Sequence, residues 1–212
     1  MKSVALVALP LALAAQLIWI LLSYFVEGIS HINDIYMPVT FIGFAAMAAT
    51  RGQSRELSML LRVFLGVTFL LAVADRFGLL GTPGSPGISW GDWSHFVADT
   101  RQINAFLPSE FAPTLAVLAT LAELSLGLTL LLGMRARQAA AGAVLLLVVY
   151  ASAMTFSLGP LSPFPYSVYV LAAGAWVLAT VDTSVLSLDA VLARRQRARR
   201  VSLAADFPRA GQ

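Results

Sequence analysis

Two polar side chains lie deep inside long apolar segments of the chain. Glu123 stands in the run LAVLATLAELSLGLTLLLG, about 11 residues or roughly 16 Å of helix rise from one end. Tyr150 lies in the next apolar run, at about 18 Å from the same side. A carboxyl group near the centre of a bilayer must be neutral or paired and must face other helices. We therefore expect Glu123 to face the interior of a helix bundle, where it could meet Tyr150.

Glu123 admits three chemical interpretations. It could be a protonated acid that donates a buried hydrogen bond and fixes helix register. It could belong to a proton relay or bind a quinone-like headgroup. It could also pair with Arg76, which would have to extend inward by most of its length. Asp75 and Arg76 end the preceding apolar run near the outer interface, where such a pair is most often an interfacial anchor and could also form the outer wall of a polar pocket above Glu123.

Membrane-spanning helices are needed to position these groups. Of the 212 residues, 58% are hydrophobic and 12% charged, and the mean hydropathy is +0.80, which excludes an ordinary soluble domain. The apolar runs lack the period-2 alternation of a barrel, so each must cross lipid as a helix. We predict an all-α polytopic transmembrane bundle with six spans, the second being either a short tilted crossing or a re-entrant segment. The predicted spans are residues 4–26, 35–50, 58–80, 112–134, 138–158 and 165–185.

Basic residues set the predicted orientation. With the N-terminus in the cytoplasm, every one of the 14 lysine and arginine residues except Arg76 and Arg101 falls on the cytoplasmic side. Both termini are therefore predicted to be cytoplasmic, in a bacterial inner membrane, with the first span kept as an uncleaved anchor. The net charge of +3 then reflects contact with the lipid bilayer, and no nucleic-acid partner is expected.

Composition divides the chain into three parts. Residues 1–50 are predicted to form a two-span hairpin, residues 51–190 a four-helix bundle, and residues 191–212 a basic cytoplasmic tail. The bundle contains the one long connection, 81–111, which opens with the turn cluster GTPGSPG. Large apolar side chains recur there at spacings of three or four, which predicts one or two short amphipathic helices, either as an interfacial aromatic belt or as part of a site. They are Trp90, Trp93, Phe96, Val97, Ile103 and Phe106.

Several kinds of chemistry are excluded by residue content. The chain contains no cysteine, which excludes disulfides, thiolate metal sites and iron–sulfur clusters. His31 and His95 both fall on the outer side, but they come from different loops without the spacing of a metal site, so no metal is expected. Phosphate-binding glycine loops and hydrolase triads are missing from the sequence. The buried polar groups are therefore the remaining candidates for function.

From residue 57 to residue 183 the chain resembles the DoxX family of small bacterial membrane proteins. That resemblance implies a four-helix membrane bundle and a link to thiosulfate:quinone oxidoreduction or to membrane redox complexes. It also implies that Glu123 and the Asp75-Arg76 pair are site positions. The first 50 residues lie outside the resemblance, and Pro165 stands where some relatives have an acidic residue. The matching features are Arg62 with Gly66, the Asp75-Arg76 pair, LAELSLGLTLLLGMRAR with Glu123, Gly127 and Gly133, and SLGPLSPFPYSVYV at 157–170.

These observations favour a quinone-interacting or redox-associated subunit of a membrane oxidoreductase complex. Because the chain cannot hold a thiol or iron–sulfur relay, the electrons would come from a soluble or membrane oxidoreductase partner. The alternatives are a non-catalytic scaffold or assembly factor and, less favoured because no inverted repeat is visible, a transporter of a small solute or proton. Catalysis by this chain and formation of a homo-oligomer stay open. The candidate quinone pocket consists of Glu123, Arg76, Asp75, Tyr150, Trp90 and Trp93.

Overall fold

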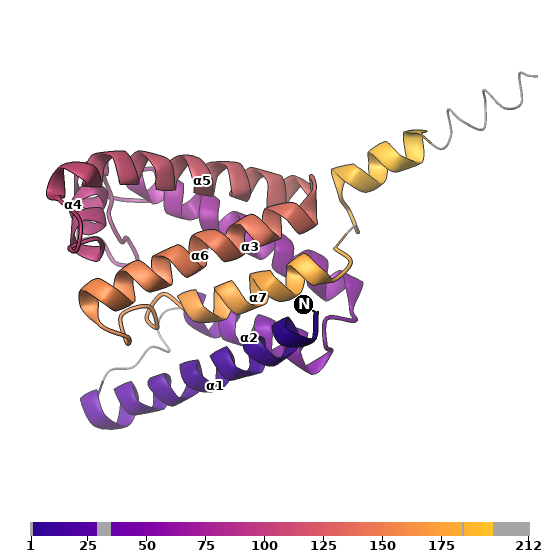
Figure 1. Ribbon diagram of the computed structural model, residues 1–212, viewed down its shortest axis with the longest axis horizontal. Coiled ribbons are helices and arrows are strands. Elements are labelled where there is room, and N and C mark those ends of the chain that lie inside the picture. Colours follow the sequence, from indigo (N-terminus) through magenta and orange to yellow (C-terminus); the bar gives the residue numbers. More distant parts are fainter. Residues whose placement is uncertain (1, 29–34, 184, 197–212) are drawn as a thin grey trace, which may run out of the picture.

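The computed structural model describes residues 2–28, 35–183 and 185–196, and this part of the chain is helical, with no strand (Figure 1). The predicted all-α class is thus confirmed. His31 and the chain after residue 196 lie outside the described residues. Residues 188–196 form one further helical segment at the C-terminal side. The named elements are α1 (Lys2–Glu27), α2 (Tyr36–Ala49), α3 (Arg55–Arg76), α4 (Trp93–Ile103), η1 (Ser109–Phe111), α5 (Ala112–Leu132), α6 (Ala136–Leu158) and α7 (Val168–Thr180).

Each predicted apolar run corresponds to a helix, but the helices differ in length. In the described part of the chain, four segments are long and apolar enough to cross a membrane: Lys2–Val26, Arg55–Arg76, Ser109–Leu132 and Ala136–Leu158. The apolar helices α2 and α7 are shorter, with 14 and 13 residues. The chain is therefore a multi-pass helical membrane protein, whereas the count of six spans stays a prediction.

The helices form two groups joined by α6 and α7. Helix α3 packs mainly against α5, α6 packs against α7, and α1 packs against the other side of α7 (Figure 1). Phe44 of α2 is fully buried and lies over Gly174 of α7, where an added Cβ would come within 2.1 Å of the Phe44 ring. A glycine at this position thus lets α2 pack tightly on α7. The two N-terminal helices are in this way held against the last apolar helix.

Helix α3 ends earlier than the predicted span 58–80. It begins after Ser54, whose hydroxyl accepts a hydrogen bond from the Leu57 N–H at 3.2 Å, and it ends at Arg76. Gly78 follows with a positive φ of 69° and closes the turn by donating its N–H to the Asp75 carbonyl. Asp75 and Arg76 therefore occupy the last turn of the helix. A side chain in that turn leans back along the helix, toward the middle of the bundle.

A glycine contact brings α3 and α5 close together. A Cβ added to Gly66 would lie 2.9 Å from the Leu131 nitrogen and 3.0 Å from the Gly127 carbonyl oxygen. A Cβ added to Gly127 would in turn lie 3.1 Å from the Gly66 carbonyl oxygen. The two backbones are therefore in direct contact, as is common where small residues face each other between membrane helices.

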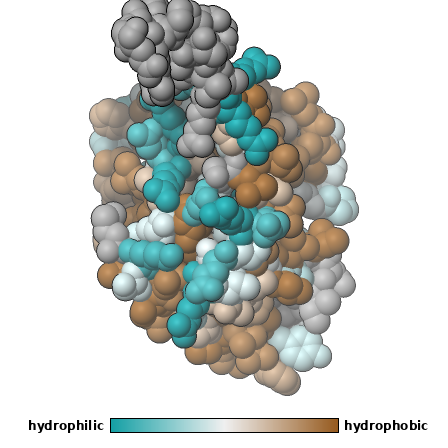
Figure 2. Space-filling model, turned by 90° about the vertical axis from the view of Figure 1, so that its right-hand side faces the viewer, coloured by the Kyte–Doolittle hydropathy of each residue, from teal (hydrophilic) through white to brown (hydrophobic). Residues whose placement is uncertain are grey.

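Exposed basic side chains gather at one end of the bundle. One end holds the N-terminus, the α2–α3 and α5–α6 turns and helix 188–196, and Figure 2 shows its hydrophilic surface between hydrophobic flanks. The opposite end holds the long connection with α4 (Figure 1). This distribution is consistent with a cytoplasmic face at the basic end. The exposed basic residues at that end are Lys2, Arg51, Arg55, Arg135, Arg137, Arg194 and Arg195.

Cysteine labelling should establish the orientation, because the chain contains no cysteine and any introduced thiol is unique. Thr82 and Gln53 are both exposed and lie in turns near opposite ends of α3. We expect Thr82→Cys to react with a membrane-impermeant maleimide in intact cells, and Gln53→Cys to react only after the cells are opened. The reverse pattern would contradict the predicted orientation.

Candidate functional site

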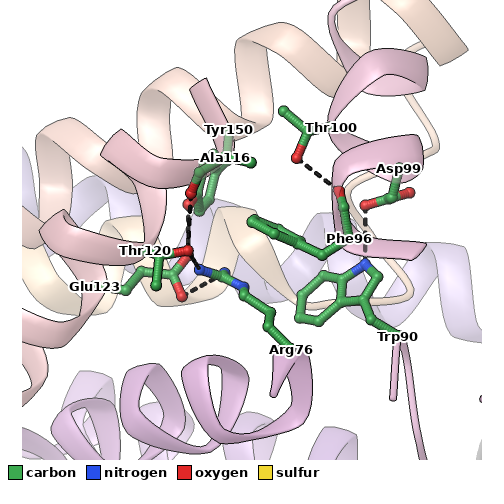
Figure 3. Close-up of polar contacts among 9 residues, drawn as sticks. All are labelled: Arg76, Trp90, Phe96, Asp99, Thr100, Ala116, Thr120, Glu123 and Tyr150. Carbon is green, nitrogen blue, oxygen red and sulfur yellow. Dashed lines mark hydrogen bonds and ion pairs between the residues drawn. The ribbon is translucent and has the colours of Figure 1, made fainter. Parts of the chain in front are cut away.

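Three helices bring together one buried cluster of polar side chains, drawn in Figure 3. Arg76 of α3 approaches Glu123 of α5 with Nη2 at 2.6 Å from Oε2, and its Nη1 donates to the Thr120 hydroxyl at 2.9 Å. The Tyr150 hydroxyl of α6 donates to Oε1 of Glu123 at 2.5 Å. Arg76 and Glu123 are 1% and 2% exposed. We call these four residues the polar cluster.

Chain direction explains how Arg76 reaches Glu123. The C-terminus of α3 lies at the end of the bundle that holds the long connection 81–111 with α4, so the Cα–Cβ bond of Arg76 leans toward the middle of the bundle. Helix α5 leaves that end with its N-terminus, so the bond of Glu123 leans outward. The two side chains therefore approach each other. Of the three interpretations of Glu123, the structure shows the pairing with Arg76. Two charges removed from water are tolerated only when they are paired and hydrogen-bonded, as they are here.

Aromatic rings cover the outer side of the guanidinium. The Arg76 Cζ atom lies 3.8 Å from the ring centroid of Phe96 and 5.1 Å from that of Trp90, distances typical of cation–π contacts. The two rings meet edge to face, with centroids 4.9 Å apart. One donor of this cation is left over, since Nε of Arg76 is buried without a hydrogen-bond partner in the described residues. Buried donors normally have a partner, in protein, water or ligand.

Asp75 does not join the polar cluster. Its carboxylate accepts hydrogen bonds from the backbone N–H groups of Ser89, Trp90 and Gly91, at 3.0, 3.1 and 3.1 Å. Successive N–H groups turned toward one carboxylate form a strong anion site. Asp75 therefore holds the outer connection so that Trp90 lies over Arg76. Asp75 is buried under the connection and does not contact Glu123, and its role as a site residue stays a prediction.

The outer connection contains the predicted amphipathic helix as α4. Asp92 caps its N-terminus by accepting from the His95 N–H at 2.9 Å, and this bond, followed by those of the His95 and Ser94 side chains, holds the pKa of Asp92 well below its ordinary value. His95 pairs with Asp92 and faces solvent. In the described ranges, no group of three potential ligands could hold a metal ion.

A second acid on α4 lies next to the aromatic cover. The indole Nε1 of Trp90 donates to Asp99 at 3.2 Å. Burial raises the pKa of the Asp99 carboxyl, while the Trp90 hydrogen bond and the charge of Arg76 oppose that rise. Phe96 was predicted from the sequence only as part of the amphipathic pattern, and Asp99 and Thr120 were not predicted as site residues. On α4, Phe96 and Asp99 follow Trp93 at spacings of three and six residues, which could have indicated them, whereas nothing in the sequence distinguishes Thr120 from the other small residues of α5.

Trp93 lies beside the cluster, at a pocket on the surface of the bundle. Its ring is stacked on Phe77 with centroids 5.8 Å apart and an interplanar angle of 13°. The pocket has a volume of about 400 Å³ and is lined by Phe77, Trp93, Val117, Thr120 and Leu121. We call it the side pocket. Thr120 is the residue that belongs both to this pocket and to the polar cluster.

Comparison with known proteins corrects the resemblance described above. The family model that matches is that of the methylamine utilisation protein MauE, over residues 54–162, which is about half of the chain. The resemblance to the DoxX family is therefore wrong, because no DoxX model matches. No curated protein and no solved structure matches the chain significantly. The matched residues run from the cap of α3 to the end of α6, so they include the whole polar cluster.

Proposed function

Because the chain belongs to the MauE family of methylamine utilisation proteins, we propose that it is a quinone-interacting membrane subunit of a redox system that serves methylamine use. Using methylamine as a nutrient requires oxidation of its carbon–nitrogen bond, and that oxidation releases two electrons. A lipid-soluble quinone takes up two electrons and two protons to become a quinol. A helical membrane protein with a polar site at mid-depth is suited to such a carrier.

The observation that supports the proposal is the polar cluster next to a pocket on the lipid-exposed side. A quinone offers two carbonyl oxygens that need hydrogen-bond donors, and reduction places negative charge on them. Arg76 is a cation already fixed in place by Glu123 and Thr120, so its positive charge needs little reorganisation to stabilise the negative charge on a nearby ring. Glu123 and Tyr150 are also the groups that could pass a proton to the reduced ring.

Electrons must come from another protein in this proposal. The sequence contains no cysteine for a thiol or iron–sulfur relay, so an oxidoreductase partner would supply both electrons. The outer connection, with α4 over the cluster, is the part of the bundle that projects toward such a partner (Figure 1). We place the protein in a bacterial inner membrane, with this connection on the outer side and both termini in the cytoplasm.

Replacing Glu123 by glutamine tests the proposal directly. The change removes the charge and keeps one of the two oxygens that accept from Arg76 and Tyr150, so one of these donors loses its acceptor. Hydrogen bonds to charged groups contribute about 1.5–3 kcal/mol. We expect saturable quenching of tryptophan fluorescence when decylubiquinone or menadione is added to the purified wild type. In Glu123→Gln the affinity should fall about tenfold or more.

Glu110→Gln is the matched control, since Glu110 is exposed and far along the chain from the polar cluster. It should bind either quinone as the wild type does. Absence of saturable quenching in the wild type, or equal affinity in Glu123→Gln, would contradict the proposal. A scaffold or assembly factor would show the first pattern, because its role does not require a quinone site.

A further inference from the structure

Two of the cavities on the surface of the described part of the bundle are large enough for a lipid-soluble ring. One is the side pocket beside α4 and α5. The other is a groove of about 550 Å³ between α1, α6 and α7, which we call the alanine groove because Ala8, Ala12 and Ala15 line its α1 side. Both volumes fall within the usual range for small-molecule sites. The chemistry of their walls distinguishes them.

We propose that a quinone headgroup moves sideways from the lipid into the side pocket and is bound there by the Thr120 hydroxyl. This inference rests on the proposed function and adds to it the location of the site and the residue that contacts the ring. It differs from a site inside the polar cluster, because Arg76 and Glu123 are covered by protein and would act on the ring through Thr120.

The walls of the side pocket suit a planar ring with a lipid tail. Phe77 and Trp93 both line the pocket, and their rings are stacked nearly parallel, so one side of the pocket is an aromatic wall. On the α5 side, Val117 and Leu121 are 46% and 58% exposed, which opens the pocket toward the acyl chains. A headgroup between these walls would leave its isoprenoid tail in the lipid.

Thr120 supplies the polar contact at the inner side of this pocket. Its hydroxyl accepts from Arg76 Nη1 at 2.9 Å and donates to the Ala116 carbonyl at 2.8 Å. That carbonyl belongs to the interior of α5, where the helix already provides an N–H for it. The hydroxyl can therefore rotate to donate to a ligand carbonyl while it still accepts from Arg76. The positive charge of Arg76 would make the Thr120 hydroxyl a stronger hydrogen-bond donor.

The unpaired donor of Arg76 is an independent sign that the site is incomplete. Nε is buried with no partner in the described residues, although the other two nitrogens of the group are bonded. Arg76 does not line the side pocket, so an ordered water that accompanies the ligand, rather than the ring itself, would satisfy this donor. Neither cavity has a charged side chain among the described residues that line it. The alanine groove differs in that its hydroxyl group, that of Tyr169, bonds to Thr155 and to the Pro160 carbonyl rather than to the polar cluster.

Filling each cavity with a phenyl ring tests the location. Val117→Phe narrows the side pocket, and Ala12→Phe narrows the alanine groove. With decylubiquinone and tryptophan quenching, we expect Val117→Phe to lower the affinity at least tenfold and Ala12→Phe to leave it unchanged. Thr120→Val should also lower the affinity, and Thr120→Ser, which keeps the hydroxyl, should restore it.

The outcomes separate this inference from the proposed function. If the wild type binds decylubiquinone and Val117→Phe binds it equally well, the side pocket is not the site, while quinone binding itself stands. Loss of affinity in Ala12→Phe alone would place the ring in the alanine groove. No saturable binding by the wild type would overturn both. Melting temperatures of the variants should be measured in the same detergent, because Val117 is exposed whereas Ala12 is partly buried against the core, and a loss of affinity counts only for a variant that melts close to the wild type.

Discussion

Arg76→Met should lower the free energy of unfolding by about 3–5 kcal/mol, which is the usual cost of leaving one partner of a buried ion pair without the other. The substitution keeps the apolar length of the side chain but removes the charge that balances Glu123. Glu123 is 2% exposed and could not regain water without moving α5 or α6. In a protein of this size the loss corresponds to a fall of roughly 10 °C in the melting temperature, measured in detergent by intrinsic fluorescence.

A double variant tests whether the loss of stability in Arg76→Met comes from the unpaired charge of Glu123. Arg76→Met with Glu123→Gln removes both charges and keeps an oxygen for the Tyr150 hydroxyl. Replacing both members of a buried pair is often close to neutral, so the double variant should recover more than half of the lost stability. A double variant as unstable as Arg76→Met would show that the guanidinium matters mainly through its packing under Phe96 and Trp90. Under the proposed function, the recovered protein should still fail to bind quinone.

The contact between Arg76 and Glu123 also shows what depth along a helix can and cannot predict. The similar depths of Glu123 and Tyr150 could be counted from the sequence at about 1.5 Å per residue, and the structure brings these side chains together. The same count of depth placed Arg76 near the end of its helix, so that its side chain would need most of its length to reach Glu123. Side chains lean toward the N-terminus of their helix, and in antiparallel neighbours this shortens the gap from both sides. Adding chain direction to depth would have predicted the ion pair.

The outer connection was less predictable because its shape depends on one distant carboxylate. The spacing of aromatic residues was sufficient to predict α4. Nothing local to residues 89–91 indicates that their three N–H groups turn toward Asp75, since that arrangement forms only after α3 and the connection have folded together. The family assignment failed for another reason. Apolar residues and glycines dominate the segments that resemble DoxX, and many helical membrane proteins share that composition.

Gly127→Leu should separate α3 from α5 and disrupt the polar cluster from a distance. A Cβ at this position would meet the Gly66 carbonyl oxygen at 3.1 Å and the Leu70 side chain at 2.9 Å, and a leucine adds three more carbons to that contact. Overpacking a tight contact usually costs about 1–3 kcal/mol. Here the cost should exceed that range, since the shift of α5 would also lengthen the bond between Arg76 and Glu123, which lie on the same two helices.

Ser125→Leu is the matched control, because Ser125 is exposed on the same helix two residues away and faces outward. It should change the melting temperature little, whereas Gly127→Leu should lower it strongly. Coupling to the ion pair can be measured by placing Gly127→Leu in the Arg76→Met, Glu123→Gln background. If the glycine contact acts by positioning the pair, the two effects should be less than additive, since the pair can be lost only once. Strict additivity would mean that the glycines stabilise the bundle without affecting the geometry of the cluster.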